Sequence, residues 1–85
     1  MKKVTVYTQD ICPYCTRAKN LLRSKNISFS EINLDQRPEN EWRELTGKTG
    51  HRTLPQIFIG EEFIGGYDEL SRLDSKGELD RKINS

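Results

Sequence analysis

The stretch VTVYTQDICPYC, residues 4–15, carries most of the information about the fold. Residues 3–8 alternate polar side chains with β-favouring ones, which predicts a β-strand. A short loop at residues 9–12 follows, and Pro13 stands where proline is tolerated, in the first turn of a helix. We therefore expect a strand that leads through a loop into a helix, with a cysteine on each side of the junction.

The other predicted elements follow from apolar spacing and from turn residues. The first helix runs to about Lys25, because Ala18, Leu21 and Leu22 recur at helical intervals. The strand after it, residues 28–34, is expected to run parallel to the first, because a crossover helix separates them. The remaining expected elements are a loop at 35–37, a helix that opens at Pro38 and ends near 47–50, a strand at 56–59, a turn at 60–62, a returning strand at 63–64, and short helices at 67–73 and 77–83. This order predicts an α/β fold of thioredoxin-like type, with a four-stranded mixed sheet flanked by helices.

Length and composition favour one small domain with few classes of partner. The 85 residues leave no room for a second domain, and 14 Lys and Arg against 13 Asp and Glu give a net charge of +1. We therefore expect neither nucleic acid nor a membrane as a partner. No apolar run approaches the roughly 20 residues of a membrane helix, and no signal-peptide segment follows Met1-Lys2-Lys3. The expected location is the cytoplasm.

The pair Cys12 and Cys15 at the start of a helix predicts redox chemistry. The first turn of a helix leaves backbone N–H groups unpaired and carries a partial positive charge, which stabilises a thiolate and lowers its pKa. Cys12 stands before the first turn and is the expected nucleophile. Cys15 follows three residues later on the same helix face, so we expect it to resolve the mixed disulfide formed on Cys12.

Other uses of the cysteine pair are disfavoured. A structural zinc site usually has four ligands, and beyond the two cysteines the chain has a single histidine, His51, so no metal site is expected. A buried, inert pair fits poorly with Pro13 and the polar residues 8–10. Two cysteines this close together, without a signal peptide, also do not make a structural disulfide framework.

Three motifs, in the same order, resemble the dithiol glutaredoxin family over almost the whole chain. They are Tyr7-Thr8 leading to Cys12-Pro13-Tyr14-Cys15, TLPQIFIG at 53–60 and GGYDEL at 65–70. The resemblance, to bacterial-like glutaredoxins with a CPYC site, implies a single glutaredoxin domain over residues 1–85. It implies an enzyme, a glutathione-dependent thiol–disulfide oxidoreductase that reduces protein disulfides and glutathione mixed disulfides. It further implies a monomer, with glutathione as reducing co-substrate, disulfide-bearing or glutathionylated proteins as partners, and no tightly bound cofactor.

The second and third motifs are where the resemblance places glutathione. In the family the equivalent of Pro55 follows a cis peptide bond, which holds the backbone of Leu54 open beside Cys12 for pairing with an extended peptide. The N–H groups of Tyr67 and Asp68 would face the γ-glutamyl carboxylate, and the Asp68 carboxylate would pair with the γ-glutamyl ammonium. From the residues alone, Leu54-Pro55 also fits a plain loop before a strand, and Asp68 also fits a helix cap.

One expected contact departs from the family. A lysine usually stands three residues before the first cysteine, and Gln9 replaces it here, so the contact to the glycine carboxylate should be weaker. Arg52 can supply the missing charge or be a solvated loop residue, and Thr8 can line the groove. Tyr67 replaces a cysteine common in relatives, which excludes regulation by a third thiol. The expected glutathione contacts are Gln9, Tyr14, Arg52, Thr53, Leu54, Pro55, Gly66, Tyr67 and Asp68.

The remaining conspicuous residues are expected to be structural. We expect Trp42 to pack on the sheet, His51 to face solvent and Lys19 to lie on a solvated helix face. The aromatic and apolar residues expected in the core are Phe29, Ile57 and Phe58.

Three rival functions use the same fold. An electron donor recharged by thioredoxin reductase is disfavoured, because such relatives differ where this chain has residues 65–68. An iron–sulfur carrier, built from one cysteine per chain with glutathione, is associated with active sites that lack a proline at the place of Pro13. A binding module without turnover conflicts with the intact cysteine pair.

Overall fold

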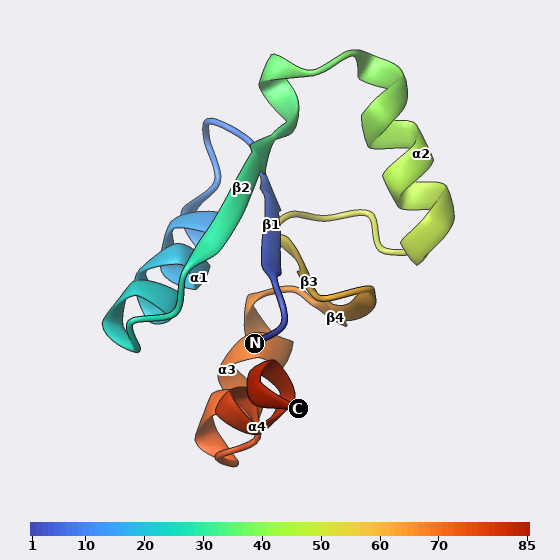
Figure 1. The fold of residues 1–85 in the computed structure, drawn as a ribbon. Helices are drawn as coiled ribbons and strands as arrows, with labels where there is room; N and C mark the ends of the chain where they lie inside the picture. Colours follow the sequence, from blue (N-terminus) through green and yellow to red (C-terminus); the bar gives the residue numbers. More distant parts are fainter.

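The alternating stretch near the N-terminus forms strand β1 (Val4–Thr8), which lies inside a four-stranded sheet of order β2-β1-β3-β4 (Figure 1). In this computed structural model, which describes residues 1–85, β2 (Phe29–Asn33) is parallel to β1. β3 (Gln56–Ile59) and β4 (Glu62–Gly65) complete the sheet by antiparallel pairing. The helical elements are α1 (Pro13–Ser24), η1 (Leu34–Gln36), α2 (Glu39–Thr49), α3 (Tyr67–Ser75) and α4 (Leu79–Asn84). The predicted mixed sheet flanked by helices is confirmed.

The main core lies on one face of the sheet, against α1, α3 and α4. Val4 and Val6 of β1 are buried there and pack with Ala18 and Leu22 of α1 and Leu70 of α3. The other members of the cluster are Ile27, Ile57, Ile59, Leu79 and Ile83. Each fully buried aliphatic side chain of this size contributes about 1.5–3 kcal/mol of transfer free energy. This packing therefore fixes α1, and with it the two cysteines, against the end of β1.

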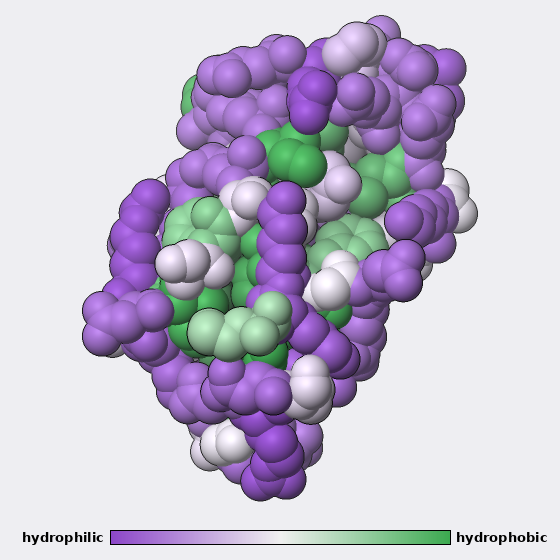
Figure 2. Space-filling view, viewed as in Figure 1, coloured by the Kyte–Doolittle hydropathy of each residue, from purple (hydrophilic) through white to green (hydrophobic).

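The opposite face of the sheet is covered more loosely. Tyr7 and Ile32 lie on this side and, together with Leu45 of α2, line a cavity of about 360 Å³. Figure 1 shows α2 standing apart from the other helices, and most of the surface in Figure 2 is hydrophilic, with apolar surface in small patches. The two faces of the sheet thus differ: one is a packed core and the other is a partly open layer.

The predicted elements agree with the structure to within two residues, with one exception. Residues 35–37 were expected to be a loop, but η1 covers Leu34–Gln36, because the Asn33 side-chain oxygen accepts a hydrogen bond from the Asp35 N–H at 2.9 Å and starts a turn. Ile57 and Phe58 are buried as expected. Phe29 is only half-buried, and the Arg23 guanidinium lies over its ring. None of the helices has both the length and the apolar character needed to cross a membrane.

Candidate active site

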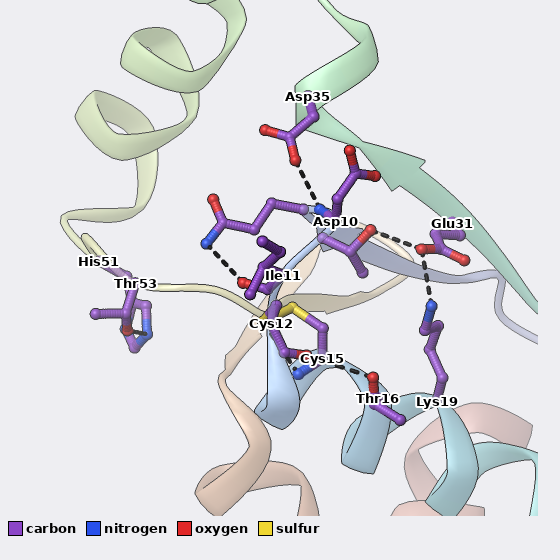
Figure 3. Close-up of a disulfide and its surroundings, with 12 residues drawn as sticks. Asp10, Ile11, Cys12, Cys15, Thr16, Lys19, Glu31, Asp35, His51 and Thr53 are labelled. Carbon is purple, nitrogen blue, oxygen red and sulfur yellow. Dashed lines mark hydrogen bonds and ion pairs between the residues drawn. A yellow bond between two sulfur atoms is a disulfide. The ribbon is translucent and has the colours of Figure 1, made fainter.

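The two cysteines sit at the N-terminus of α1, where the core packing holds them. Cys12 is the N-cap residue, and a disulfide joins it to Cys15 in the first turn, with the Cα atoms 5.2 Å apart (Figure 3). The backbone N–H of Cys15 also donates to the Cys12 Sγ, with 3.2 Å between nitrogen and sulfur. The Cys12 sulfur thus takes the place of the capping acceptor. Negative charge on this atom is stabilised by the N–H and by the positive end of the helix.

The cysteines differ in accessibility. Cys15 is only 2% exposed, whereas Cys12 is half-buried and lines a surface cavity. The first turn of α1 contains no acidic side chain that would oppose a thiolate. Once reduced, the site can therefore present an accessible thiolate at Cys12 with a shielded thiol directly behind it.

A network of polar side chains fixes the loop that precedes Cys12. The Asp10 N–H donates to the Asp35 Oδ2 at 2.7 Å (Figure 3). The Asn33 Nδ2 donates to the Asp10 Oδ1, also at 2.7 Å. Asn33 also caps η1, so the same residue joins the end of β2, the 3₁₀ turn and the active-site loop. The loop is therefore held from both sides, and the position of Cys12 does not depend on α1 alone.

A groove runs from Cys12 to the start of α3 and consists of two adjoining cavities. They share Tyr14, Thr53 and Leu54 and measure about 310 Å³ and 350 Å³. The first cavity is lined by Gln9, Ile11, Cys12, Pro13, Tyr14, Trp42, Arg52, Thr53 and Leu54. The second is lined by Tyr14, His51, Thr53, Leu54, Pro55, Gly66, Tyr67, Asp68 and Glu69. All nine residues expected to contact glutathione thus lie in one groove.

The loop before β3 forms the middle of this groove. The peptide bond between Leu54 and Pro55 is cis, as the resemblance implies. Leu54 is half-buried and borders both cavities, while Pro55 is buried at the start of β3. A cis X-Pro bond is uncommon in folded proteins, and here it stands in the segment that faces Cys12 across the first cavity.

The far end of the groove is the N-terminus of α3. Gly66 is its N-cap residue, and the Glu69 Oε1 accepts a hydrogen bond from the Gly66 N–H at 2.7 Å. The first N–H groups of a helix, here those of Tyr67 and Asp68, have no partner within the helix and are available to an anion. Gly65 has a φ of +122°, and a side chain there would begin 2.6 Å from the Glu69 Oε1. Glycine at 65 is therefore required for the cap to form.

Several residues lie elsewhere than the sequence suggested. Trp42, expected on the sheet, lines the cavity of Cys12, because α2 stands away from the sheet. His51, expected in solvent, is half-buried: its Nε2 lies 3.0 Å from the Thr53 Oγ1, and its ring meets the ring of Phe63 edge-on at 5.6 Å. Thr8 is fully buried and does not line this groove.

Thr8 instead belongs to a polar cluster beneath the loop. Its hydroxyl donates to the Glu31 Oε2 at 2.7 Å, and the Lys19 Nζ lies 3.0 Å from the same oxygen (Figure 3). The hydrogen bond from Thr8 is the main cause that lowers the pKa of the Glu31 carboxyl below its usual range, and Lys19 adds to it. Lys19, expected on a solvated face, thus tethers α1 to β2. No group of three or more His, Cys, Asp or Glu side chains is placed to hold a metal ion.

The fold and the site together define a class of protein. A thioredoxin-like sheet that places a C-x-x-C pair at the end of β1 and the start of α1 defines a thiol–disulfide oxidoreductase. Comparison with known families narrows the class, because the glutaredoxin family model matches residues 4–64. The chain belongs to the glutaredoxin family.

Individual relatives agree with this assignment. The chain is 46% identical over 85 residues to a glutaredoxin of Pseudomonas aeruginosa, covering 100% of both chains. It is 46% identical over 80 residues to glutaredoxin 3 of Escherichia coli K12, covering 94% of this chain and 95% of the relative. A buckwheat glutaredoxin–glutathione complex superposes with a TM-score of 0.91 at 30% identity, covering 98% of this chain and 77% of the other. A glutaredoxin of Brucella melitensis gives 0.85 at 41% identity, covering 100% and 94%.

Proposed function

We propose that this glutaredoxin reduces protein disulfides and glutathione mixed disulfides with Cys12 as nucleophile and Cys15 as resolving thiol. The observation that carries the proposal is the asymmetry of the pair: the Cys12 sulfur caps α1 and is accessible, while Cys15 is buried behind it. A thiolate is the attacking species in disulfide exchange, so the cysteine whose charge is stabilised and accessible is the one that attacks.

The route for protein disulfides uses both cysteines. The Cys12 thiolate attacks one sulfur of the substrate disulfide, and the other sulfur leaves as a thiolate that takes up a proton. Cys15 then loses its proton and attacks the Cys12 sulfur, which releases the second substrate thiol and leaves the enzyme disulfide. Two glutathione thiols reduce that disulfide and become glutathione disulfide, so two electrons pass from glutathione to the substrate.

The route for glutathionylated proteins needs Cys12 alone. Its thiolate attacks the sulfur of the bound glutathione, and the protein thiol leaves. A second glutathione thiolate attacks the same glutathione sulfur, which frees Cys12 and forms glutathione disulfide. Because Cys15 takes no part, this route separates the roles of the two cysteines in an experiment.

We place glutathione along the groove from Cys12 to α3. The edge of Leu54 offers backbone groups for strand-like pairing, and the N–H groups of Tyr67 and Asp68 suit the γ-glutamyl carboxylate. Asp68 suits the γ-glutamyl ammonium. Gln9 and Arg52 lie together in the first cavity and suit the glycine carboxylate. The remaining contacts would come from Tyr14, Thr53, Pro55 and Gly66.

The wider setting is proposed on the same basis. Reduction by glutathione needs a reducing glutathione pool, which favours the cytoplasm. We further propose that residues 1–85 act as one monomeric domain, because the cysteines, the Leu54-Pro55 segment and the start of α3 all come from one chain. The net charge of +1 gives no support for a nucleic-acid or membrane partner.

A coupled assay tests the proposal. The reduction of a glutathione–cysteine mixed disulfide is followed with NADPH, glutathione reductase and glutathione, for the wild type, Cys12→Ser and Cys15→Ser. We expect Cys12→Ser to be inactive and Cys15→Ser to remain active on this substrate while losing activity on a protein disulfide.

A parallel assay with thioredoxin reductase in place of the glutathione system serves as the control. Turnover supported only by thioredoxin reductase would contradict the proposed glutathione site. Activity that survives in Cys12→Ser but not in Cys15→Ser would reverse the two roles.

A further inference from the structure

Two exposed apolar side chains flank the reactive cysteine. Apart from Met1, the large hydrophobic residues with a mostly exposed side chain are Ile11, which is 88% exposed, and Tyr14, which is 54% exposed. They stand one residue before and two residues after Cys12. Single exposed apolar residues scattered over a surface are ordinary, but these two border the same site. Their position on both sides of Cys12 indicates a surface that a bound partner would cover.

The first cavity of the groove is the more apolar of the two. Five of its nine lining residues are hydrophobic, against three of nine in the second cavity. Ile11 and Tyr14 lie there together with Trp42 of α2 and Leu54. The groove therefore has an apolar end beside Cys12 and a polar end at the start of α3.

The backbone holds Ile11 in its exposed position. Asp10, the residue before it, is fixed by the hydrogen bonds to Asn33 and Asp35. The Gln9 side chain donates to the carbonyl of Ile11 at 3.5 Å (Figure 3). Cys12, the residue after it, is fixed as the cap of α1. A surface that is already ordered loses little conformational entropy on binding, so the apolar contact is gained at low cost.

We propose that Ile11, Tyr14 and Trp42 form a docking surface for an apolar side chain next to the reactive cysteine of a polypeptide substrate. The inference rests on the proposed role of Cys12. In the exchange step the substrate sulfur lies within bonding distance of the Cys12 Sγ, so the residues that flank the substrate cysteine lie over those that flank Cys12. The occupant is therefore a disulfide-bearing polypeptide segment.

Within the docking surface, Ile11 is the residue that distinguishes a polypeptide from glutathione, because Tyr14 also borders the glutathione groove. Glutathione carries γ-glutamyl and glycine on either side of its cysteine, and neither has an apolar side chain to place on Ile11. Ile11 thus sets a preference among protein disulfides. Burial of one apolar side chain on a partly open surface corresponds to a preference of about tenfold.

The test compares two peptide disulfides with a small reference substrate. The peptides are symmetric disulfides, identical except that the residues on both sides of the cysteine are leucine in one and serine in the other. The reference is the glutathione–cysteine mixed disulfide. The second-order rate constant kcat/KM is measured for the wild type, Ile11→Thr and Ile11→Val. Threonine keeps the β-branched shape and removes apolar surface, and valine keeps most of that surface.

We expect the wild type to prefer the leucine peptide by about tenfold, and Ile11→Thr to reduce this ratio to about twofold or less. Ile11→Val should keep the preference. The ratio compares two peptides in the same protein, so any effect of the substitution on the reaction with glutathione, which the reference substrate measures, cancels from it. An unchanged leucine preference in Ile11→Thr would overturn the inference. A wild type inactive on the reference substrate would overturn the proposed function itself. An active wild type without the leucine preference would overturn the docking surface alone.

Discussion

The N-termini of α1 and α3 face the same groove but are built in opposite ways. At α1 the Cys12 sulfur itself is the capping acceptor, and no acidic side chain stands in the first turn. At α3 the N-cap residue, Gly66, has no side chain, and the carboxylate of Glu69 caps its N–H instead. Asp68 adds a second acidic group in that turn. The partial positive charge at the start of α1 is thus available to stabilise a thiolate, while that at the start of α3 is largely offset by two carboxylates.

This difference shows how one physical effect serves two purposes. An uncompensated helix N-terminus favours any anion, which suits a cysteine that must ionise near neutral pH. A helix N-terminus whose partial positive charge is offset by acidic side chains, as in α3, binds a lone anion only weakly. With free N–H groups beside the Asp68 carboxylate, it instead favours a group that carries an anion and a cation together, such as the α-amino acid end of a γ-glutamyl peptide.

Gly65→Ala should give the largest effect, because it removes the cap of α3. The new side chain would begin 2.6 Å from the Glu69 Oε1 and 2.8 Å from its Cγ, at a φ of +122° that only glycine adopts readily. We expect a loss of about 3 kcal/mol in the free energy of unfolding, measured by denaturant titration. Gly47→Ala is the matched control, since Gly47 is exposed inside α2 with open space around it, and it should stabilise the protein by up to about 1 kcal/mol. Equal effects of the two substitutions would contradict the requirement for glycine at 65.

Tyr14→Glu should make the start of α1 resemble that of α3. A carboxylate in the first turn opposes the thiolate of Cys12, so the pKa of that thiol should rise by about one unit. The measurement is a titration of the thiolate by its ultraviolet absorbance in the reduced protein. Tyr14→Phe keeps the ring without the charge and should leave the titration unchanged. A pKa that does not respond to the glutamate would show that the helix N-terminus is not what activates Cys12.

Glu69→Gln should keep the hydrogen bond that caps α3 and remove the negative charge of the capping side chain. The amide oxygen can still accept from the Gly66 N–H, while the loss of the negative charge should improve binding of the γ-glutamyl carboxylate by about twofold. Binding is measured with S-methylglutathione, which has no free thiol. Glu69→Ala removes the acceptor as well and should lower the free energy of unfolding by about 1 kcal/mol. Weaker binding in Glu69→Gln would show that Glu69 supports the ligand directly.

Glu31→Gln should give the smallest effect, a loss of stability that is present at neutral pH and disappears in acid. Because the folded-state pKa of Glu31 lies below its ordinary value of 4.5, the carboxylate adds stability that is complete above that value and is lost as the pH falls through the folded-state pKa. The group is partly exposed, so we expect a few tenths of a kcal/mol. The difference in stability between the wild type and Glu31→Gln is measured by thermal unfolding at neutral pH and at acidic pH. A wild type that loses no more stability in acid than Glu31→Gln would contradict the assigned pKa shift.

The fold could be predicted from the sequence because its signals are local. The alternation in β1, the apolar spacing in α1 and the position of Pro13 each follow from a few neighbouring residues. The 3₁₀ turn η1 was missed, since it depends on a side-chain cap by Asn33 that leaves no periodic pattern. The same residue reaches Asp10 across 23 positions of the chain, and no local rule reveals such a contact.

Residues of the proposed site that lie in sequence motifs could be predicted, whereas residues that reach the site only through the tertiary structure were missed. Cys12, Leu54 and Asp68 all stand within recognisable segments, and the structure brings them into one groove. Trp42 reaches the groove only because α2 stands away from the sheet, which the sequence of the helix does not reveal. His51 had a usable signal, since it lies four residues before Pro55 in the same loop.

The burial of Cys15 has a further consequence for the lifetime of the protein in an oxidising cell. Peroxide that reaches the accessible Cys12 thiolate converts it to a sulfenic acid, which can be oxidised further to forms that reducing thiols do not repair. Cys15 is too buried to be attacked itself, yet it is near enough to condense with the sulfenic acid and form the disulfide with loss of water. We therefore expect oxidation to stop at the Cys12–Cys15 disulfide, which is reduced again in each catalytic cycle.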